Sequence, residues 1–304
     1  MTGDAVLIAG PTASGKSRAA LELAEAIGGV VINADSMQVY AEAPVLTAQP
    51  SARDKARVPH LLYGHVPVRQ VYSVGRWRED AIAALAQARA LARTPVFVGG
   101  TGMYFGALTD GLADIPPVPP DVRAAARALL DEIGVAALHD RLAARDPVTA
   151  ARLRPTDPQR VLRAWEVLAA TGRPLADWQD APAAPVLPKD ARIAAFVLDP
   201  PRPLLRAQIA ARFAAMVDQG GLDEARALVG LDPALPAAKL LGLRPLQELA
   251  AGLLTREAAL EAAITATRQF AKRQMTWFRH RMAHYSWYDP TQSNIITQYK
   301  NISA

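Results

Sequence analysis

The stretch that most constrains the fold is Gly10-Pro11-Thr12-Ala13-Ser14-Gly15-Lys16-Ser17, which matches the pattern G-x-x-x-x-G-K-S/T at every fixed position. It follows an apolar run at residues 5–9 that is typical of a buried strand, and it precedes residues 17–27, whose apolar positions recur at helical spacing. A glycine-rich turn between a strand and a helix presents backbone N–H groups to a phosphate. We expect Lys16 to reach exposed phosphate oxygens and Ser17 to offer its hydroxyl to Mg²⁺.

The composition is consistent with a folded protein and gives a weak indication of its partner. Hydrophobic residues make up 51% of the 304 residues, which is enough for one large domain or one domain with an insertion. A net charge of +5 suits an anionic partner without requiring one. The absence of cysteine excludes disulfides and thiolate metal sites. With no signal segment and no membrane-spanning run in view, we expect a cytoplasmic protein without a membrane partner.

Two more strands are predicted to end beside the phosphate loop. Residues 30–34 are followed by Asp35, and residues 96–98 are followed by the glycine-rich turn Gly99-Gly100-Thr101-Gly102. In an open α/β sheet the carboxyl ends of the strands line the ligand crevice, so both segments are expected there. Asp35 is a candidate general base, a magnesium ligand through water or a hydroxyl binder, but it could equally cap the next turn.

The segment after the second strand is expected to be an exposed loop over residues 41–60, because it carries three prolines and a charged patch. His60 and His65 lie on opposite faces of a short apolar run, so we expect polar contacts from each of them and no shared metal. Ser73 is expected to cap a helix over residues 74–93.

Proline-rich segments then flank a helical block. Residues 115–120 and 181–188 are stiff and proline-rich, and the sequence between them has helical spacing over residues 122–133, 135–144, 147–153 and 158–171. We therefore expect a catalytic core of residues 1–115 and 189–304 and a helical insertion domain of residues 116–188. A strand over residues 193–198 resumes the sheet.

Two helices carry basic edges. The helix that begins at Asp157-Pro158 has Gln159, Arg160 and Arg163 along one edge, which is either a contact surface or a solvated helix face. Helices are also expected over residues 204–219, 222–228 and 255–284. The last of these has stripes of arginine and lysine with interleaved aromatic residues, which suit a phosphate backbone as well as they suit a charged surface helix. The end of the chain, from Pro290, is polar and is expected to be loosely held.

Five stretches carry a resemblance to a known family. The chain resembles the bacterial tRNA dimethylallyltransferases, which transfer an isopentenyl group to the adenine next to the anticodon of tRNA. The resemblance and the strand pattern together predict an α/β fold, with a P-loop NTPase-like parallel sheet flanked by helices and an all-helical insertion domain. The matching stretches are residues 10–17, Asn33-Ala34-Asp35-Ser36-Met37-Gln38-Val39-Tyr40, residues 98–104, residues 157–163 and residues 267–279.

The resemblance implies a reaction and a set of site residues. It implies that the phosphate loop holds the diphosphate of dimethylallyl diphosphate, that Asp35 is the general base, and that the protein binds the anticodon stem-loop of tRNA. Mg²⁺ is the expected cofactor, and a monomer is the default expectation. The site prediction assigns Asp35, Lys16 and Thr101 to catalysis; Gly10, Pro11, Thr12, Ala13, Ser14, Gly15, Lys16, Ser17 and Arg212 to the diphosphate; Ser17 to the metal; and Asp35, Ser36, Met37, Gln38, Thr101, Arg123, Gln159, Arg160, Val161, Leu162, Arg163 and Arg244 to tRNA.

The chain departs from the family pattern at several polar positions. Gln49 stands where a lysine is usual, Leu61 where a histidine is usual, and Gln208 and Leu243 where an arginine and a tyrosine are usual. Each change removes a side chain that could touch an anion or RNA. Together they bear on rate and affinity more than on the type of reaction.

Three other functions compete with this interpretation. A P-loop small-molecule kinase shares the loop and the acid after the second strand, but it explains neither the helical insertion nor the basic C-terminal helix. A related transferase could act on free adenine nucleotide, although the insertion favours a polymer. A non-catalytic RNA-binding protein would have had no need to keep Lys16, Ser17 and Asp35.

Overall fold

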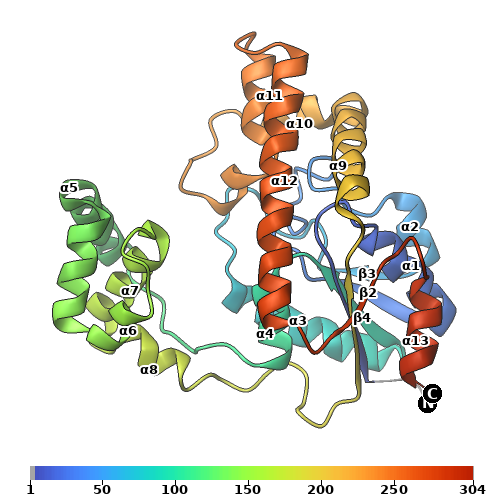
Figure 1. Cartoon of the computed structure of the whole chain (residues 1–304), viewed down its shortest axis with the longest axis horizontal. Helices are drawn as coiled ribbons and strands as arrows, with labels where there is room; N and C mark the ends of the chain where they lie inside the picture. The colour runs from blue at the N-terminus through green and yellow to red at the C-terminus, as the bar shows by residue number, and fades with distance from the viewer. Residues whose placement is uncertain (1–3, 304) are drawn as a thin grey trace. The chain divides into compact units, whose positions relative to one another are not determined.

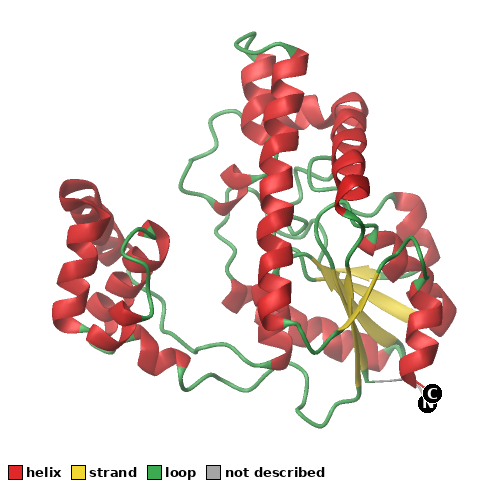
Figure 2. Ribbon diagram, in the orientation of Figure 1, coloured by secondary structure: helices red, strands yellow, loops and turns green. Residues whose placement is uncertain are grey.

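The computed structural model describes residues 4–303, and it is built around a six-stranded sheet in the order β3-β2-β4-β1-β5-β6 (Figure 1). Every neighbouring pair of strands is parallel, and helices lie on both faces of the sheet (Figure 2). The predicted α/β fold class is therefore confirmed. The strands are β1 (Ala5–Ala9), β2 (Gly29–Asn33), β3 (His60–Leu61), β4 (Thr94–Gly99), β5 (Ile193–Leu198) and β6 (Ser286–Tyr288).

The strand β1 lies at the centre of the hydrophobic core. All five of its residues are fully buried, because β4 and β5 pair with its two edges and helices cover both faces. Val6 and Ile8 face a cluster that includes residues of α1 (Lys16–Ile27) and α13 (Ile295–Ser303). Continuous apolar strands of this kind are typical of parallel sheets that are buried on both sides.

The loops that follow β1 and β4 diverge at the carboxyl ends of these two strands. The chain passes from β1 to β2, which lies beyond β4, and from β4 to β5, which lies beyond β1. A reversal of this kind leaves a crevice at the carboxyl edge of the sheet. The remaining helices of this unit are α2 (Ala52–Arg57), α3 (Val74–Ala90), α4 (Gly102–Thr109), α9 (Arg202–Met216), α10 (Leu222–Ala227), α11 (Leu243–Ala250) and α12 (Arg256–Arg281), with a π-helical segment at Val217–Gly221 and a 3₁₀-helix at Pro236–Lys239.

The chain divides into two compact units, one of residues 1–109 with 186–304 and one of residues 110–185. These boundaries lie close to the proline-rich segments from which the sequence-based boundaries at 115/116 and 188/189 were drawn. The second unit is helical, as predicted, with two clusters of buried apolar side chains of its own. Its helices are α5 (Pro120–Arg145), which kinks at Gly134, α6 (Pro147–Ala151), α7 (Pro158–Thr171) and α8 (Leu175–Gln179).

The helix α7 begins and ends as its sequence indicates. The Asp157 side chain accepts a hydrogen bond from the Arg160 backbone N–H, and Pro158 occupies the first turn, where no N–H is needed. Gly172 ends the helix in a left-handed conformation with φ of 67°.

Two expectations drawn from polar sequence are wrong. Residues 41–60 are not an exposed loop, because Ala43, Leu46 and Thr47 are buried and α2 lies within the segment. The region after Pro290 is not loosely held. It forms α13, which lies beside α1 (Figure 1) and buries Ile295 in the core of the sheet. Within residues 4–303, no helix is long and apolar enough to cross a membrane.

Candidate active site

The phosphate loop lies between β1 and α1, as predicted. Gly15 adopts φ of 86°, a left-handed conformation that favours glycine and brings the next residues into the helix. The Ser14 hydroxyl is buried and has no hydrogen-bond partner within the described residues. An unpaired buried hydroxyl in a loop of this shape fits a site that is completed by a ligand with acceptor oxygens.

Lys16 is 6% exposed and its ammonium group donates weakly to the Pro11 carbonyl, at 3.4 Å. Burial lowers the pKa of Lys16 from 10.5 to about 8. The negative charge of Asp35 raises this pKa, and the positive charge of Arg212 lowers it further. Burial also lowers the pKa of Arg212, again opposed by Asp35. The buried Lys16 and the partly exposed Arg212 therefore share one carboxylate, and the site favours a further anion.

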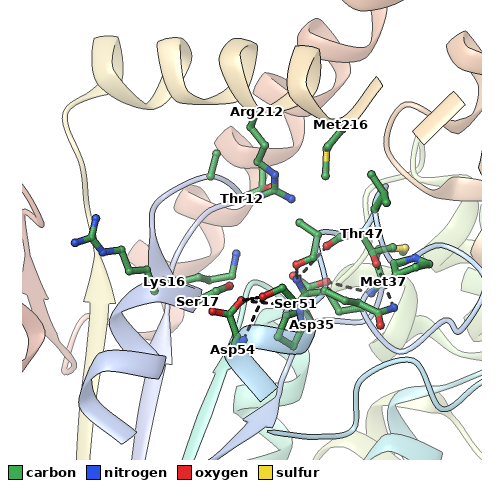
Figure 3. Close-up of a pocket in the computed structure, with 18 of the residues that line it drawn as sticks. Thr12, Lys16, Ser17, Asp35, Met37, Thr47, Ser51, Asp54, Arg212 and Met216 are labelled. Carbon is green, nitrogen blue, oxygen red and sulfur yellow. Dashed lines mark hydrogen bonds between the residues drawn. The ribbon is translucent and has the colours of Figure 1, made fainter. Parts of the chain in front are cut away.

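A cavity of about 1170 Å³ opens beside the loop, and Figure 3 shows Lys16, Ser17, Asp35 and Arg212 around it. Arg212 projects from α9 toward the phosphate loop, and Met216, one turn later, projects into the cavity (Figure 3). The cavity thus has a charged wall and an apolar wall. The apolar side chains that line it include those of Val45, Leu46, Ala211, Ala215, Met216, Leu240, Leu241 and Phe270.

Asp35 follows β2, where its neighbours hold it in a fixed turn. The buried Asn33 side chain donates to the Asp35 carbonyl and accepts from the Asp35 N–H, both at 2.9 Å. One oxygen of the Asp35 carboxylate accepts from the Met37 N–H at 3.1 Å. The second carboxylate oxygen takes part in no such bond to the backbone of the turn and is available for chemistry in the cavity.

Thr101 contributes to this turn from the neighbouring strand end. Its hydroxyl oxygen accepts from the Ser36 N–H at 2.9 Å, and the hydroxyl donates to the Ser36 hydroxyl at 3.2 Å. Thr101 does not line the cavity, whereas Met37 and Gln38 do. The Gln38 amide donates to the carbonyls of Thr47 and Ala48, so it orders the loop that forms another wall of the cavity.

The departures from the family pattern fit their surroundings in two places. The Gln49 amide donates to the Tyr40 carbonyl at 2.7 Å and closes the loop on itself. Leu243 is 3% exposed and packs in the interior of its unit, where an apolar residue is well placed. Gln208 lies one helical turn before Arg212 and lines the cavity.

The side chains at the loop offer few ligands for a magnesium ion. Ser17 and Asp35 line the same cavity, and residues 4–303 contain no cluster of three or more histidine, aspartate or glutamate side chains arranged to hold a metal. Mg²⁺ commonly takes one or two protein oxygens and completes its shell with phosphate oxygens and water. The donor set therefore fits a magnesium ion that arrives with a phosphorylated substrate.

The residues predicted to bind tRNA on the helical unit divide by exposure. Gln159 and Arg160 are exposed on the first turn of α7, and Arg163 is half-buried one turn later. Val161 and Leu162 are buried in the core of the unit, so their side chains stabilise its packing and offer no contact surface. Arg123 is exposed on α5. In the other unit, Arg244 is exposed on α11 and pairs with Glu248 at 2.9 Å.

The helix α12 carries both a basic face and a buried face. Arg268, Lys272 and Arg273 are exposed along the outer face, while Phe278 is fully buried and Phe270 and Trp277 are partly buried. Trp277 packs so closely against Gly102 that a Cβ atom at Gly102 would lie 2.2 Å from the indole ring.

Sequence reasoning gave no role to Gln274, although the structure places it between two loops of the site. Its Oε1 accepts from the Thr12 N–H at 2.9 Å, and its Nε2 donates to the Gly100 carbonyl at 2.9 Å. One sequence signal could have identified it. A polar residue in register with Ala271, Met275 and Phe278 lies on the buried face of the helix, and a buried amide needs partners.

The strand order, the glycine-rich loop after β1 and the cavity at the carboxyl ends of the strands define an α/β protein of the P-loop NTPase-like class. A family model described as IPP transferase matches residues 38–281, and one described as Isopentenyl transferase matches residues 3–58. The chain belongs to the IPP transferase family.

Known proteins similar to this chain agree with that assignment. The tRNA dimethylallyltransferases of Rhodospirillum centenum and Rhodopseudomonas palustris are 54% and 51% identical to it, over 95% of this chain and 92% and 91% of theirs. The full-length tRNA isopentenylpyrophosphate transferase of Bacillus halodurans superposes with a TM-score of 0.69 at 31% identity, over 99% of this chain and 96% of its own. A eukaryotic dimethylallyltransferase acting on tRNA gives a TM-score of 0.76 at 26% identity, over 90% and 69%. The resemblance inferred from the sequence motifs is confirmed.

Proposed function

We propose that this protein transfers a dimethylallyl group from dimethylallyl diphosphate to N6 of the adenine that follows the anticodon of tRNA, with release of diphosphate. The observation that carries the proposal is the shared cavity. The phosphate loop and Asp35 line it together, and apolar side chains such as those of Leu46, Met216 and Phe270 line another part of it. A site with one cationic wall, one carboxylate and one apolar wall suits a substrate with a diphosphate at one end and a short hydrocarbon at the other.

The chemistry requires a base and a place for the departing charge. The bond from the allylic carbon to the diphosphate oxygen breaks as a bond from that carbon to N6 forms, and N6 loses a proton. The amine is a weak nucleophile because its lone pair is delocalised into the ring, and the Asp35 carboxylate takes the proton. Lys16 and Arg212 stabilise the diphosphate oxygens, and the electrostatic effect of Lys16 is large because its side chain is buried.

The supporting residues hold this arrangement. Thr101 and Asn33 fix the turn that carries Asp35. Ser17 would hold a magnesium ion, which would neutralise charge on the diphosphate when bound.

The RNA is proposed to contact exposed basic side chains on both units. Its adenine must leave the stacked anticodon loop to enter the cavity, as bases that undergo chemistry generally do. The exposed basic side chains proposed to bind tRNA are those of Arg123, Arg160, Arg244, Arg268, Lys272 and Arg273, and the neutral Gln159 and half-buried Arg163 lie beside Arg160 on α7.

The competing functions are less well supported. A small-molecule kinase shares the phosphate loop and Asp35, but the family assignment and the helical insertion speak against it. The related proteins named above act on tRNA according to their names, which favours a polymer over free adenine nucleotide. A non-catalytic RNA-binding protein would not require the cavity.

We further propose that the protein acts in the cytoplasm, because tRNA is found in that compartment. We also propose that it is a monomer, and light scattering of the purified protein tests its mass in solution.

Mass analysis of an anticodon stem-loop tests the proposed function. After incubation with the protein, magnesium and dimethylallyl diphosphate, the RNA should gain the mass of one prenyl unit on the adenine that follows the anticodon. Parallel reactions with ATP and with free adenine nucleotide distinguish the alternatives. Turnover of ATP or prenylation of the free nucleotide, with an unchanged stem-loop, would contradict the proposal.

A further inference from the structure

The Gln274 amide is a buried polar group on the apolar face of α12. The residue is 5% exposed and lies among Ala271, Met275 and Phe278. Each end of its amide has a backbone partner at 2.9 Å, and the two partners belong to different loops. One partner is the Thr12 N–H in the phosphate loop, and the other is the Gly100 carbonyl in the Gly99–Gly102 turn. A single side chain therefore joins two segments that are far apart in the sequence.

These two segments separate where Gln274 bridges them. The strands β1 and β4 pair up to Ala9 and Gly99, and the Gly10 N–H still donates to the Gly99 carbonyl, at 3.3 Å. Beyond that point the loops diverge, and the Gln274 amide fills the gap between them. The Gln274 amide leaves no room for a side chain at position 100, because a Cβ atom at Gly100 would lie 2.1 Å from the Gln274 Nε2.

The bridge also lies against the proposed base. The same Cβ position at Gly100 is 3.2 Å from one Asp35 carboxylate oxygen, so the turn that Gln274 holds lies beside Asp35 with no room for a side chain between them. On its other side Gln274 holds Thr12, which lines the cavity together with Lys16. The amide thus fixes the separation between the loop proposed to hold the leaving group and the residue proposed to take the proton.

We propose that Gln274 is a positioning residue of the transfer reaction. It touches neither substrate, and it acts through Thr12 and Gly100 by setting the distance between the diphosphate site and Asp35. The proposal rests on the proposed function, since it assumes that both sites act in one reaction. Reacting groups displaced by about 1 Å can lose a hundredfold in rate even when both substrates still bind.

Loss of the bridge should therefore affect the rate more than binding. In Gln274→Met the side chain keeps its length and loses both hydrogen bonds. We expect kcat to fall by roughly ten- to a hundredfold, with KM for dimethylallyl diphosphate changed by less than about threefold. Gln274→Glu keeps an acceptor for the Thr12 N–H and loses the donor to Gly100, so its kcat should lie between those of the wild type and the methionine variant.

Gln247 supplies a matched control. Its amide donates to the carbonyls of Ala225 and Leu228, at 3.3 and 2.9 Å, and it does not line the cavity. Gln247→Met thus also removes two hydrogen bonds to backbone carbonyl or amide groups, but in a different part of the same unit. It should lower the melting temperature by an amount similar to Gln274→Met while leaving kcat unchanged.

The experiment measures kcat and both KM values with the anticodon stem-loop, together with the amide hydrogen exchange of Thr12. The expected result is a selective loss of kcat and faster Thr12 exchange in Gln274→Met. A kcat within about twofold of the Gln247 control, or a loss confined to KM, would overturn the proposal. If both Gln274 variants fail to fold, the role is purely structural and the proposal fails as well. Absence of transfer by the wild-type protein would instead refute the proposed function, so the two failures are distinguishable.

Discussion

At the scale of single residues, the site is defined by a lysine that is buried before any ligand arrives. Lys16 is buried and Arg212 is partly exposed, and Asp35 opposes the lowering of the pKa of both. Burial of a charge is unfavourable unless a partner compensates it, and one carboxylate cannot fully compensate two cations. The ligand-free protein therefore gives up stability at the position where it gains affinity for an anion.

Replacement of Lys16 should reveal this conflict between stability and function. In the unfolded chain Lys16 keeps its proton up to about pH 10.5, whereas in the folded protein it loses the proton above about pH 8. The unfolded state binds more protons between these values, so stability rises with pH across that window. At pH 7 the Lys16→Met variant should be more stable than the wild type by up to about 3 kcal/mol, although it should not transfer the prenyl group.

Urea unfolding at several pH values measures this effect. The advantage of Lys16→Met should shrink as the pH rises from 8 toward 10.5. Lys55→Met removes an exposed lysine from α2 and should leave the free energy of unfolding unchanged. An equal stability of Lys16→Met and wild type at pH 7 would show that the burial of Lys16 is already compensated.

Replacement of Asp35 tests the base. Asp35→Asn keeps the size of the side chain and an acceptor for the Met37 N–H, but it cannot take a proton from the amine. Single-turnover transfer should slow by roughly a hundred- to ten-thousandfold, because general-base catalysis contributes about that much, while tRNA binding persists. Asp54 lines the same cavity and caps α2 through Ser51. Asp54→Asn should therefore retain most of the activity, and near-normal transfer by Asp35→Asn would exclude Asp35 as the base.

At the scale of secondary-structure elements, the close approach of α12 to the Gly99–Gly102 turn determines the shape of the site. In Gly102→Ala the added methyl group would overlap the Trp277 ring. Overpacking of a dense interior of this kind should destabilise the protein by roughly 1–3 kcal/mol. Gly75 lies near the start of α3, where a Cβ atom meets only the Ser73 hydroxyl at 3.6 Å. Gly75→Ala should leave stability unchanged or raise it slightly, and thermal unfolding of both variants measures the contrast.

The sequence was most informative for elements defined by local patterns. The runs at β1 and β5, the phosphate loop, and the cap at Asp157 were predicted because a strand, a glycine motif and a capping residue each leave a signal within a few positions. The buried segment around Leu46 was missed because its order comes from distant residues. The Glu224 carboxylate accepts from the N–H groups of Val45 and Leu46, at 2.7 and 2.8 Å.

The same reasoning explains what was missed at the site. The partners of Gln274 lie more than 170 residues away along the chain, so no local pattern identifies them. The helix α13 was missed because its polar composition outweighed the spacing of Ile295 and Tyr299, which pack on α1 only once the sheet has formed. Non-local contacts of this kind override local propensity.

At the scale of the whole molecule, the two ends of the helical unit leave the core close together. The N–H groups of Val186 and Leu187 donate to the carbonyls of Ala107 and Leu108, at 3.2 and 2.9 Å. Residues 110–185 have their own buried clusters, so their removal should leave the core intact. A variant in which a short glycine–serine linker joins Thr109 to Val186 should fold and bind diphosphate, but it should not prenylate the stem-loop.

Circular dichroism and calorimetry with diphosphate measure the outcome for this deletion variant. The wild-type protein is the reference for diphosphate affinity, and the Lys16→Met variant is the negative control. Loss of the cooperative unfolding transition would show that the core depends on the helical unit for stability.

The position of β1 in the sheet has a further consequence for the order in which the protein is made. The strand pairs with β4 on one edge and with β5 on the other, where Ala5 lies opposite Ile193. A ribosome releases residues 193–198 only after the entire helical unit, so the nascent chain holds β1 with one edge unpaired during that interval. Unpaired edges are templates for association with other chains. Closure of the sheet, and with it assembly of the α9 wall, is therefore a late step of biosynthesis.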